Sequence, residues 1–203
     1  MKKILVTAIL SLFAFSGFAQ TMRQLFVSLP DSVLMPQLTK VNREDCVDFL
    51  DSKMKAEVTN RFDGKSTLDT LSADYLHLTL SPMSEVEMKL FPVNDSVKAI
   101  CWIQTYGNDS TIRESSVRFF STDWKELPRE RFIAVPKASE FVGDLSGAEA
   151  DVALALTPIF VKASFVPGDD AIRFSLSLGH IAPDMLDKVR KYVSPDKVCR
   201  LKL

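Results

Sequence analysis

Regular alternation of apolar and polar side chains between residues 75 and 121 is the feature that most restricts the fold. The apolar positions of the first two runs, which are separated by Pro82-Met83, are Leu76, Leu78, Leu80, Val86, Met88 and Leu90. An extended strand turns successive side chains to opposite faces, so a period of two predicts half-buried strands. Short polar loops between the runs predict hairpins, and therefore an antiparallel meander.

A second pair of runs, at residues 97–106 and 111–121, continues the pattern across the polar loop Gly107-Asn-Asp-Ser110. In the first of these runs Cys101 falls on one face and Trp102 on the other. Apolar side chains on both faces are typical of strands in a sheet that is covered on both sides. We therefore expect a central hairpin whose thiol and aromatic groups serve mainly in packing.

Helical patterns flank these strands. Thr21 and Gln24 have the spacing of a capping box, and a stronger helix is expected to begin near Asn42. After a connector, the expected elements are a helix opened by a second capping box at Ser146–Glu149, strands near 159–165 and 172–178, a helix from Pro183 and a strand at 198–203.

The order of these elements predicts an α+β fold: N-terminal helices, a mainly antiparallel β-sheet (meander) packed with helices, and a C-terminal β-β-α-β unit. We expect a single domain over residues 20–203, with a subdivision near 122–145 as the alternative. A chain of this length buries roughly 70% of its unfolded surface, so folding requires neither a metal nor a disulfide.

The N-terminus has the pattern of a secretory signal peptide over residues 1–19. Lys2 and Lys3 precede an apolar segment from Ile4 to Phe15, and small residues at Gly17 and Ala19 fit a cleavage site after Ala19. The segment is too short to span a bilayer, and no later apolar run is long enough to do so. No Cys follows it, so we expect a periplasmic or secreted protein that is not a lipoprotein.

The charge balance limits the classes of partner. Lys and Arg number 25 against 26 Asp and Glu, which gives a net charge of −1. A chain with so little charge lacks the basic surface typical of nucleic-acid-binding proteins. We therefore expect no nucleic acid as partner.

The three cysteines, Cys46, Cys101 and Cys199, leave two interpretations open. Cys101 and Cys199 lie in expected strands and could form a disulfide, because export permits oxidation. Alternatively, all three are small buried apolar residues. An odd number of cysteines allows at most one internal bridge.

Two short motifs match catalytic or nucleotide-binding patterns by chance. Gly64-Lys65-Ser66 resembles the end of a phosphate-binding loop, but Thr59 stands where that loop requires a glycine. Ser194 and Lys197 have the Ser-x-x-Lys spacing, but the motif follows a helix instead of opening one and contains Pro195. We interpret both as turn sequences, and no cofactor is expected.

The remaining candidates are His77, His180, Cys101 and the pair Glu85 and Glu87. No spacing typical of metal ligands occurs, so no metal site is expected. His77 could activate Cys101 as a nucleophile if the two side chains met in an open cleft. Glu85 and Glu87 share a strand face, as paired carboxylates in sugar hydrolysis would. Their regular alternation with core residues favours a solvated face, and His180 is expected in a loop, so we assign no catalytic residue.

The run "LFVSLPDSVLMPQLTKVNREDCVDFLDSKMKAEVTNRFDGKSTLD" resembles the N-terminal signature of a family of small secreted proteins of unknown function from Bacteroides-type bacteria. The later run "ICWIQTYGNDSTIRESSVRFFSTDWKEL" is similar to the same family. The resemblance implies a lineage and an exported location, and it implies no catalytic residues.

Four Asp-Ser or Asp-Thr sequences resemble the acceptor motif for O-glycosylation of exported proteins in such bacteria. The acceptor residues would be Ser32, Thr70, Ser96 and Ser110. Asp and Ser are also favoured in turns, so capping without modification is the alternative.

These observations favour an exported, non-catalytic binding protein whose partner is a protein or peptide of the cell envelope. An alternative is an envelope- or polymer-directed hydrolase whose active site is not visible in the sequence. A third possibility is an assembly subunit that donates or accepts a strand at an open sheet edge.

Overall fold

The computed structural model describes residues 20–202, except 32–33, 95–96, 109 and 195. The expected signal peptide at residues 1–19 and the proposed acceptors Ser32 and Ser96 lie outside the described residues. In the described part of the chain, none of the helices has the length and apolar character that a membrane crossing requires.

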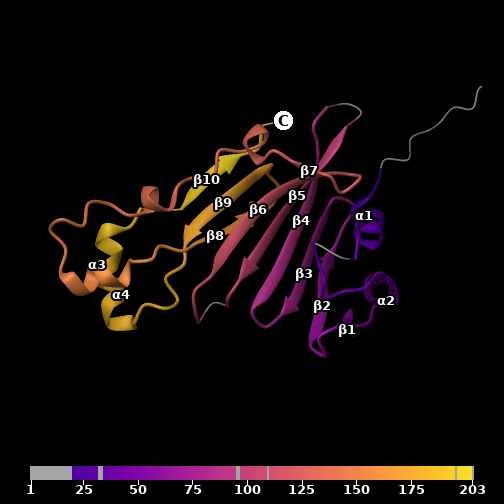
Figure 1. The fold of residues 1–203 in the computed structure, drawn as a ribbon, viewed down its shortest axis with the longest axis horizontal. Coiled ribbons are helices and arrows are strands. Elements are labelled where there is room, and N and C mark those ends of the chain that lie inside the picture. The colour runs from indigo at the N-terminus through magenta and orange to yellow at the C-terminus, as the bar shows by residue number, and fades with distance from the viewer. Residues whose placement is uncertain (1–19, 32–33, 95–96, 109, 195, 203) are drawn as a thin grey trace, which may run out of the picture.

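A seven-stranded antiparallel sheet forms the middle of the molecule (Figure 1). Its strands are β1 (Glu57–Thr59), β2 (Lys65–Leu71), β3 (Tyr75–Ser81), β4 (Ser84–Pro92), β5 (Lys98–Tyr106), β6 (Glu114–Ser121) and β7 (Glu126–Leu127). Each strand pairs with the next one in the sequence, so the sheet is a meander. The α+β class and the antiparallel meander predicted from the alternating pattern are confirmed.

Two helices cover one face of this main sheet. α1 (Met22–Ser28) begins with the predicted capping box between Thr21 and Gln24. α2 (Lys40–Asp51) begins earlier than predicted, because Thr39 and Asn42 form a second capping box that satisfies the first free N–H groups.

The core between these helices and the sheet is apolar, and its largest member is Trp102, which is 1% exposed. The buried residues that the strands contribute are Val58, Leu68, Leu76, Leu78, Leu80, Val86, Met88, Leu90, Ile100, Trp102 and Phe120. One charged side chain, that of Arg43, is also buried here. Its guanidinium donates to the carbonyl of Leu38 at 2.8 Å, to the carbonyl of Leu29 and to Asp31 at 2.9 Å. It therefore joins the end of α1 to α2.

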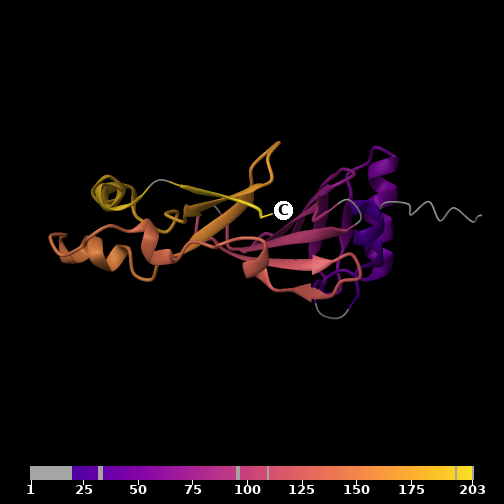
Figure 2. The ribbon, with the colours of Figure 1, turned by 90° about the horizontal axis from the view of Figure 1, so that it is seen from above.

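A three-stranded antiparallel sheet packs on the opposite face. It contains β8 (Val161–Phe165), β9 (Ala171–Leu176) and β10 (Lys197–Arg200), in the order β10-β9-β8. β8 contacts β5 and β6, and the shared core includes Cys101, Phe119, Ile172 and Phe174. Figure 2 shows the resulting layers, with α1 and α2 on one side of the main sheet and the small sheet on the other.

The end of the molecule farthest from α1 and α2 consists of α3 (Ala150–Ala155) and α4 (Pro183–Val189) (Figure 1). They share a separate small core that contains Val152 and Val189. The predicted capping box at Ser146–Glu149 is wrong: Ser146 bonds to Asp144, and Glu149 precedes α3 without a side-chain cap. The described chain also contains three short 3₁₀ helices, Arg129–Arg131, Ala138–Phe141 and Arg190–Tyr192.

Several strand boundaries differ from the prediction. In the part of the chain that the structure describes, seven strands precede α3, whereas the pattern indicated four or five. β1 and β7 have three and two residues, which is too short for a periodic signal, and a bulge between Leu68 and Thr70 breaks the alternation in β2. The run expected at 111–121 becomes a strand only at Glu114, and Ile112 remains exposed in the preceding loop.

Candidate functional site

The structure places three residues singled out from the sequence on one face of the main sheet. His77 of β3 lies opposite Glu87 of β4, and Thr79 lies opposite Glu85. The intervening residues of both strands point into the helix-side core, so these side chains point away from α1 and α2. We define the polar face as Asp69, Tyr75, His77, Glu85 and Glu87.

His77 bridges two carboxylates. Its Nδ1 lies 3.4 Å from Oδ2 of Asp69, and its Nε2 lies 3.7 Å from Oε2 of Glu85. The contact with Glu85, supported by the charge of Asp69, raises the pKa of His77 although burial opposes this. The raised pKa and the two neighbouring carboxylates favour an ion-pair role for this imidazole over that of a general base.

Glu85 is held between Arg113 and His77. The Arg113 guanidinium, which is 10% exposed, donates to Oε1 of Glu85. The contact with His77 lowers the pKa of Glu85, and the charge of Arg113 adds to this effect against the cost of burial. The backbone N–H of Arg113 also donates to Oγ of Ser177 at 2.7 Å, which ties this cluster to the chain after β9.

Glu87 has a different environment from Glu85. The Tyr75 hydroxyl donates to its Oε1 at 2.7 Å. Burial raises the pKa of Glu87, and the hydrogen bond from Tyr75 only partly offsets this effect. The two glutamates on one strand therefore shift in opposite directions.

Cys101 is not placed to react with His77. The two residues belong to β5 and β3, with β4 between them, so they lie two strands or about 10 Å apart across the sheet. Cys101 is fully buried, and burial raises the pKa of its thiol well above the ordinary value. A thiolate nucleophile at Cys101 is therefore unfavourable.

The cysteines are all free thiols in the structure. Cys101 and Cys199 belong to the same core, but no disulfide joins them. Cys46 lies on the buried side of α2, where burial raises the pKa of its thiol to about 11. These positions favour the interpretation that the cysteines serve as small packing residues.

A cavity of about 410 Å³ lies between the polar face and the turn that joins β8 to β9. Its lining residues are Asp74, Tyr75, Glu87, Lys89, Phe165, Val166, Pro167 and Gly168. The rings of Tyr75 and Phe165 meet edge to face, with centroids 6.1 Å apart. This volume lies within the range of small-ligand sites, which extends from about 300 to 1,000 Å³.

Lys89 fixes the turn above the sheet. Its Nζ donates to the carbonyl of Asp169 at 2.7 Å and to Oδ1 of Asp170 at 2.8 Å. The Lys89 side chain is only 14% exposed, so this ion pair is largely shielded from water. The cavity is therefore preformed by a contact between β4 and the β8–β9 turn.

The other sequence motifs form no site. Ser66 is buried in β2 and donates to the carbonyl of Leu80, so Gly64–Ser66 does not form a phosphate cradle. Lys197 lies in β10 beside Glu140, and the His180 ring packs edge-on against Phe160. Among the described residues, no group of three or more His, Cys, Asp or Glu side chains is placed to hold a metal ion.

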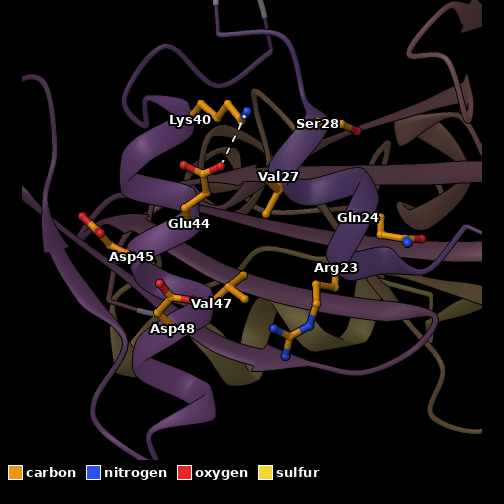
Figure 3. A pocket seen from close by; sticks show the side chains of 9 residues that line it. All are labelled: Arg23, Gln24, Val27, Ser28, Lys40, Glu44, Asp45, Val47 and Asp48. Atoms are coloured by element: carbon orange, nitrogen blue, oxygen red, sulfur yellow. Dashed lines mark ion pairs between the residues drawn. The ribbon is translucent and has the colours of Figure 1, made fainter.

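A second depression of about 690 Å³ lies between α1 and α2 (Figure 3). Val27 and Val47 lie between its charged residues, and the rim includes the ion pair between Lys40 and Glu44 at 3.6 Å. Arg23 pairs with Asp51 at 2.6 Å. These exposed ion pairs already neutralise part of the charge on the rim. This surface is therefore a weaker candidate for a ligand site than the cavity.

Exposed apolar side chains gather at the end of the main sheet where the β1–β2, β3–β4 and β5–β6 turns lie. They are Phe62, Met83, Tyr106 and Ile112. The Gly107 N–H donates to the carbonyl of Met83 at 2.9 Å, which joins two of the turns. Aromatic and Met side chains in this arrangement resemble the composition of protein interfaces.

Sequence reasoning identified His77, Glu85 and Glu87 but missed their partners. Tyr75 occupies the same alternating register and could have been included on that signal. Arg113 lies in the loop before β6, and a periodic pattern does not report the contacts that a loop residue makes. The pattern therefore could not predict its contact with Glu85.

Comparison with known proteins gives two findings. The family described as "Protein of unknown function (DUF3256)" matches residues 14–201. A solved structure, that of a domain of an uncharacterized protein from Porphyromonas gingivalis W83, shares 22% sequence identity with a TM-score of 0.72. The match covers 89% of this chain and 97% of that one, and it shows the fold alone. Among curated proteins, none matches the chain.

Proposed function

The chain belongs to this family of unknown function, and we propose that it is an exported, non-catalytic binding protein that holds a segment of a protein or peptide in the cavity beside the polar face. The observation that carries the proposal is the preformed cavity of about 410 Å³, with aromatic and apolar walls and two carboxylates. Sites for ligands commonly combine apolar walls with a few placed polar groups.

The chemistry of the polar face supports binding over catalysis. His77 is held between two carboxylates, Glu85 between Arg113 and His77, and Cys101 lies in the core. Each of these groups would need to leave its present partners or surroundings to act as a base or nucleophile.

The proposed export rests on the order of features at residues 1–19, where a basic start precedes a short apolar segment and a small-residue cleavage site. Intact mass and N-terminal sequencing of protein from the native envelope test it. A mature chain that begins at Gln20 is expected. A chain that retains Met1 and stays in the cytoplasm would contradict the proposal.

The binding proposal is tested by capture of a partner from envelope extracts with three proteins. These are the wild type, Val166→Trp, which narrows the cavity, and Val198→Trp, a matched change at an exposed position of β10. Purified partner should bind the wild type and Val198→Trp alike and lose affinity for Val166→Trp. Equal binding to all three proteins would remove the cavity as the binding site.

A hydrolase acting on envelope or dietary polymers is the second candidate, favoured by one observation. The pKa of Glu87 is raised by burial, whereas contact with His77 lowers that of Glu85, and opposite shifts are typical of acid and base pairs. Turnover of glycoside or peptide substrates that disappears in Glu87→Gln would establish this function in place of the first.

A further inference from the structure

The acidic side chains near the cavity differ in whether they have a cationic partner. Glu85 contacts His77 and Arg113, and Asp170 contacts Lys89. Over the described part of the chain, no ion pair reaches Glu87 or Asp74, both of which line the cavity. Among the described residues, the one side-chain hydrogen bond to Glu87 comes from the neutral Tyr75 hydroxyl and occupies Oε1, which leaves Oε2 to accept another.

Burial makes this imbalance significant. Glu87 is half-buried, and a carboxylate removed from water is costly unless a cation or several hydrogen bonds compensate. Lys89, the one basic side chain of the cavity lining, is already bound to Asp170 and to the Asp169 carbonyl. The lining therefore holds two carboxylates that its own Lys89 does not neutralise. His77 lies opposite Glu87 and its charge favours the carboxylate, but it makes no ion pair with Glu87 among the described residues.

Lys162 does not neutralise these carboxylates either. Its charge acts on both Glu85 and Glu87, but it makes no ion pair with either within the described residues. It lines a separate depression together with Arg113, at the open end of the β8–β9 hairpin and away from the Pro167 turn. Its side chain is consequently part of the Arg113 surroundings, and the cavity remains acidic.

We infer that the cavity binds the basic side chain of a lysine or arginine in a polypeptide partner, with the cationic group at Glu87 and Asp74 and the aliphatic stem against Phe165, Val166 and Pro167. This inference rests on the proposed binding function and names the chemistry that the partner must present.

The walls suit the two parts of such a side chain. Lysine and arginine combine an apolar stem with a charged end, and the stem packs readily on apolar surface. The Tyr75 and Phe165 rings line the cavity together with Glu87. The face of an aromatic ring attracts a cation, so these rings also favour a basic side chain. A neutral or acidic side chain would leave Glu87 without compensation or add repulsion.

The test uses the complete mature chain and four peptides: acetyl-Ala-Lys-Ala-amide, its arginine analogue, its Nε-acetyl-lysine analogue and its glutamate analogue. Chemical shifts of backbone amides are followed in ¹⁵N-labelled protein at low salt. The lysine and arginine peptides should shift the amide signals of Tyr75, Lys89 and Gly168. The acetylated and glutamate peptides should bind at least about tenfold more weakly, which corresponds to about 1.4 kcal/mol of binding free energy.

Two variants locate the charge. Glu87→Gln keeps the shape of the side chain and an acceptor for the Tyr75 hydroxyl, and it should weaken binding of the lysine peptide about tenfold. Glu126→Gln changes an exposed carboxylate that pairs with Arg118 on β6, and it should bind as the wild type does. Thermal unfolding of both variants confirms that each is folded.

The outcomes separate this inference from the proposed function. Equal binding of the acetylated peptide, an unchanged affinity in Glu87→Gln, or no shifts with either basic peptide would overturn the inference. If Val166→Trp nevertheless loses the envelope partner, the cavity remains the binding site for a different chemistry. If Val166→Trp keeps that partner while the basic peptides bind at Glu87, the site recognises cations but is not where that partner docks.

Discussion

The two faces of the main sheet share the same strands but differ in what lies on them. The face beneath α1 and α2 is mainly apolar from Leu68 of β2 to Phe120 of β6, and the buried Ser66 is a polar exception on it. The opposite face is apolar beneath the small sheet, around Cys101 and Phe119, and polar over β2, β3 and the first half of β4. Polar side chains therefore gather where neither the two helices nor the small sheet covers the main sheet. The alternating strand pattern alone does not decide this position.

The polar groups on each face are accommodated differently. Arg43 is buried in the helix-side core because carbonyls of the α1 end and the Asp31 carboxylate accept its hydrogen bonds. On the opposite face, water is near and the groups form a chain of contacts from Asp69 through His77 and Glu85 to Arg113. The energetic cost of a change should therefore be larger on the helix side.

The largest effect is expected for Trp102→Ala on the helix side. The ring packs against Phe120 and Trp124 and is 1% exposed, so its removal should cost about 3–5 kcal/mol of unfolding free energy. Urea denaturation measures this. Tyr106→Ala, at the exposed end of the same strand, is the control. A loss below about 1 kcal/mol would show that the two faces do not differ as described.

Arg43→Ala should cost about 3 kcal/mol, because it leaves buried carbonyls without their donor. Arg43→Lys should recover part of the loss, since one ammonium supplies a charge but not the forked guanidinium. Equilibrium unfolding of the three proteins provides the comparison. If Arg43→Ala were as stable as the wild type, the guanidinium would not be what joins α1 to α2.

Glu85→Gln on the polar face should cost less, about 1–2 kcal/mol, because the cluster is partly exposed and salt weakens it. The exposed pair of Arg118 and Glu126 provides the control, and Glu126→Gln should cost less again. As ionic strength rises, the loss of unfolding free energy in Glu85→Gln should approach that of the control. Equilibrium unfolding at low and high salt measures this change. A salt-independent loss would indicate packing instead of charge.

The smallest effect concerns pH and His77. Because the folded pKa of His77 is raised, its ion pairs contribute fully below the ordinary value of 6.5 and are lost as pH rises through the folded pKa. The stability difference between wild type and His77→Gln should therefore shrink on the alkaline side of that value. His180 is present in both proteins and cancels. A difference that grows with pH would mean that His77 is neutral in the fold.

Much of this arrangement could be predicted from the sequence. The alternation around Cys101 and Trp102 correctly divided β5 between two cores. It also placed Glu85 and Glu87 on one strand face and His77 on the polar side of its strand, and the register of β3 and β4 brings the three together. It failed at β1 and β7, which are too short for periodicity. The family of unknown function that the sequence resembled is confirmed, whereas secretion and glycosylation at Thr70 or Ser110 stay predictions.

The partners of the site could not be predicted, because they come from distant parts of the chain. Lys89 and Asp170 are 81 positions apart, and the loop position of Arg113 gives no sign that it meets Glu85. Local patterns report which way a side chain points, and they contain no information on which segment will lie above it.

The sequence by itself determined the strands, their two faces and the helix caps at Thr21, since these follow from steric alternation and local hydrogen bonds. The tertiary structure alone decided that the β8–β9 turn lies over β4, that Glu85 contacts Arg113 and His77, and that no ion pair reaches Glu87 among the described residues. Contacts across a long loop depend on how whole layers pack, so the charge of the cavity exists only once the two sheets have met.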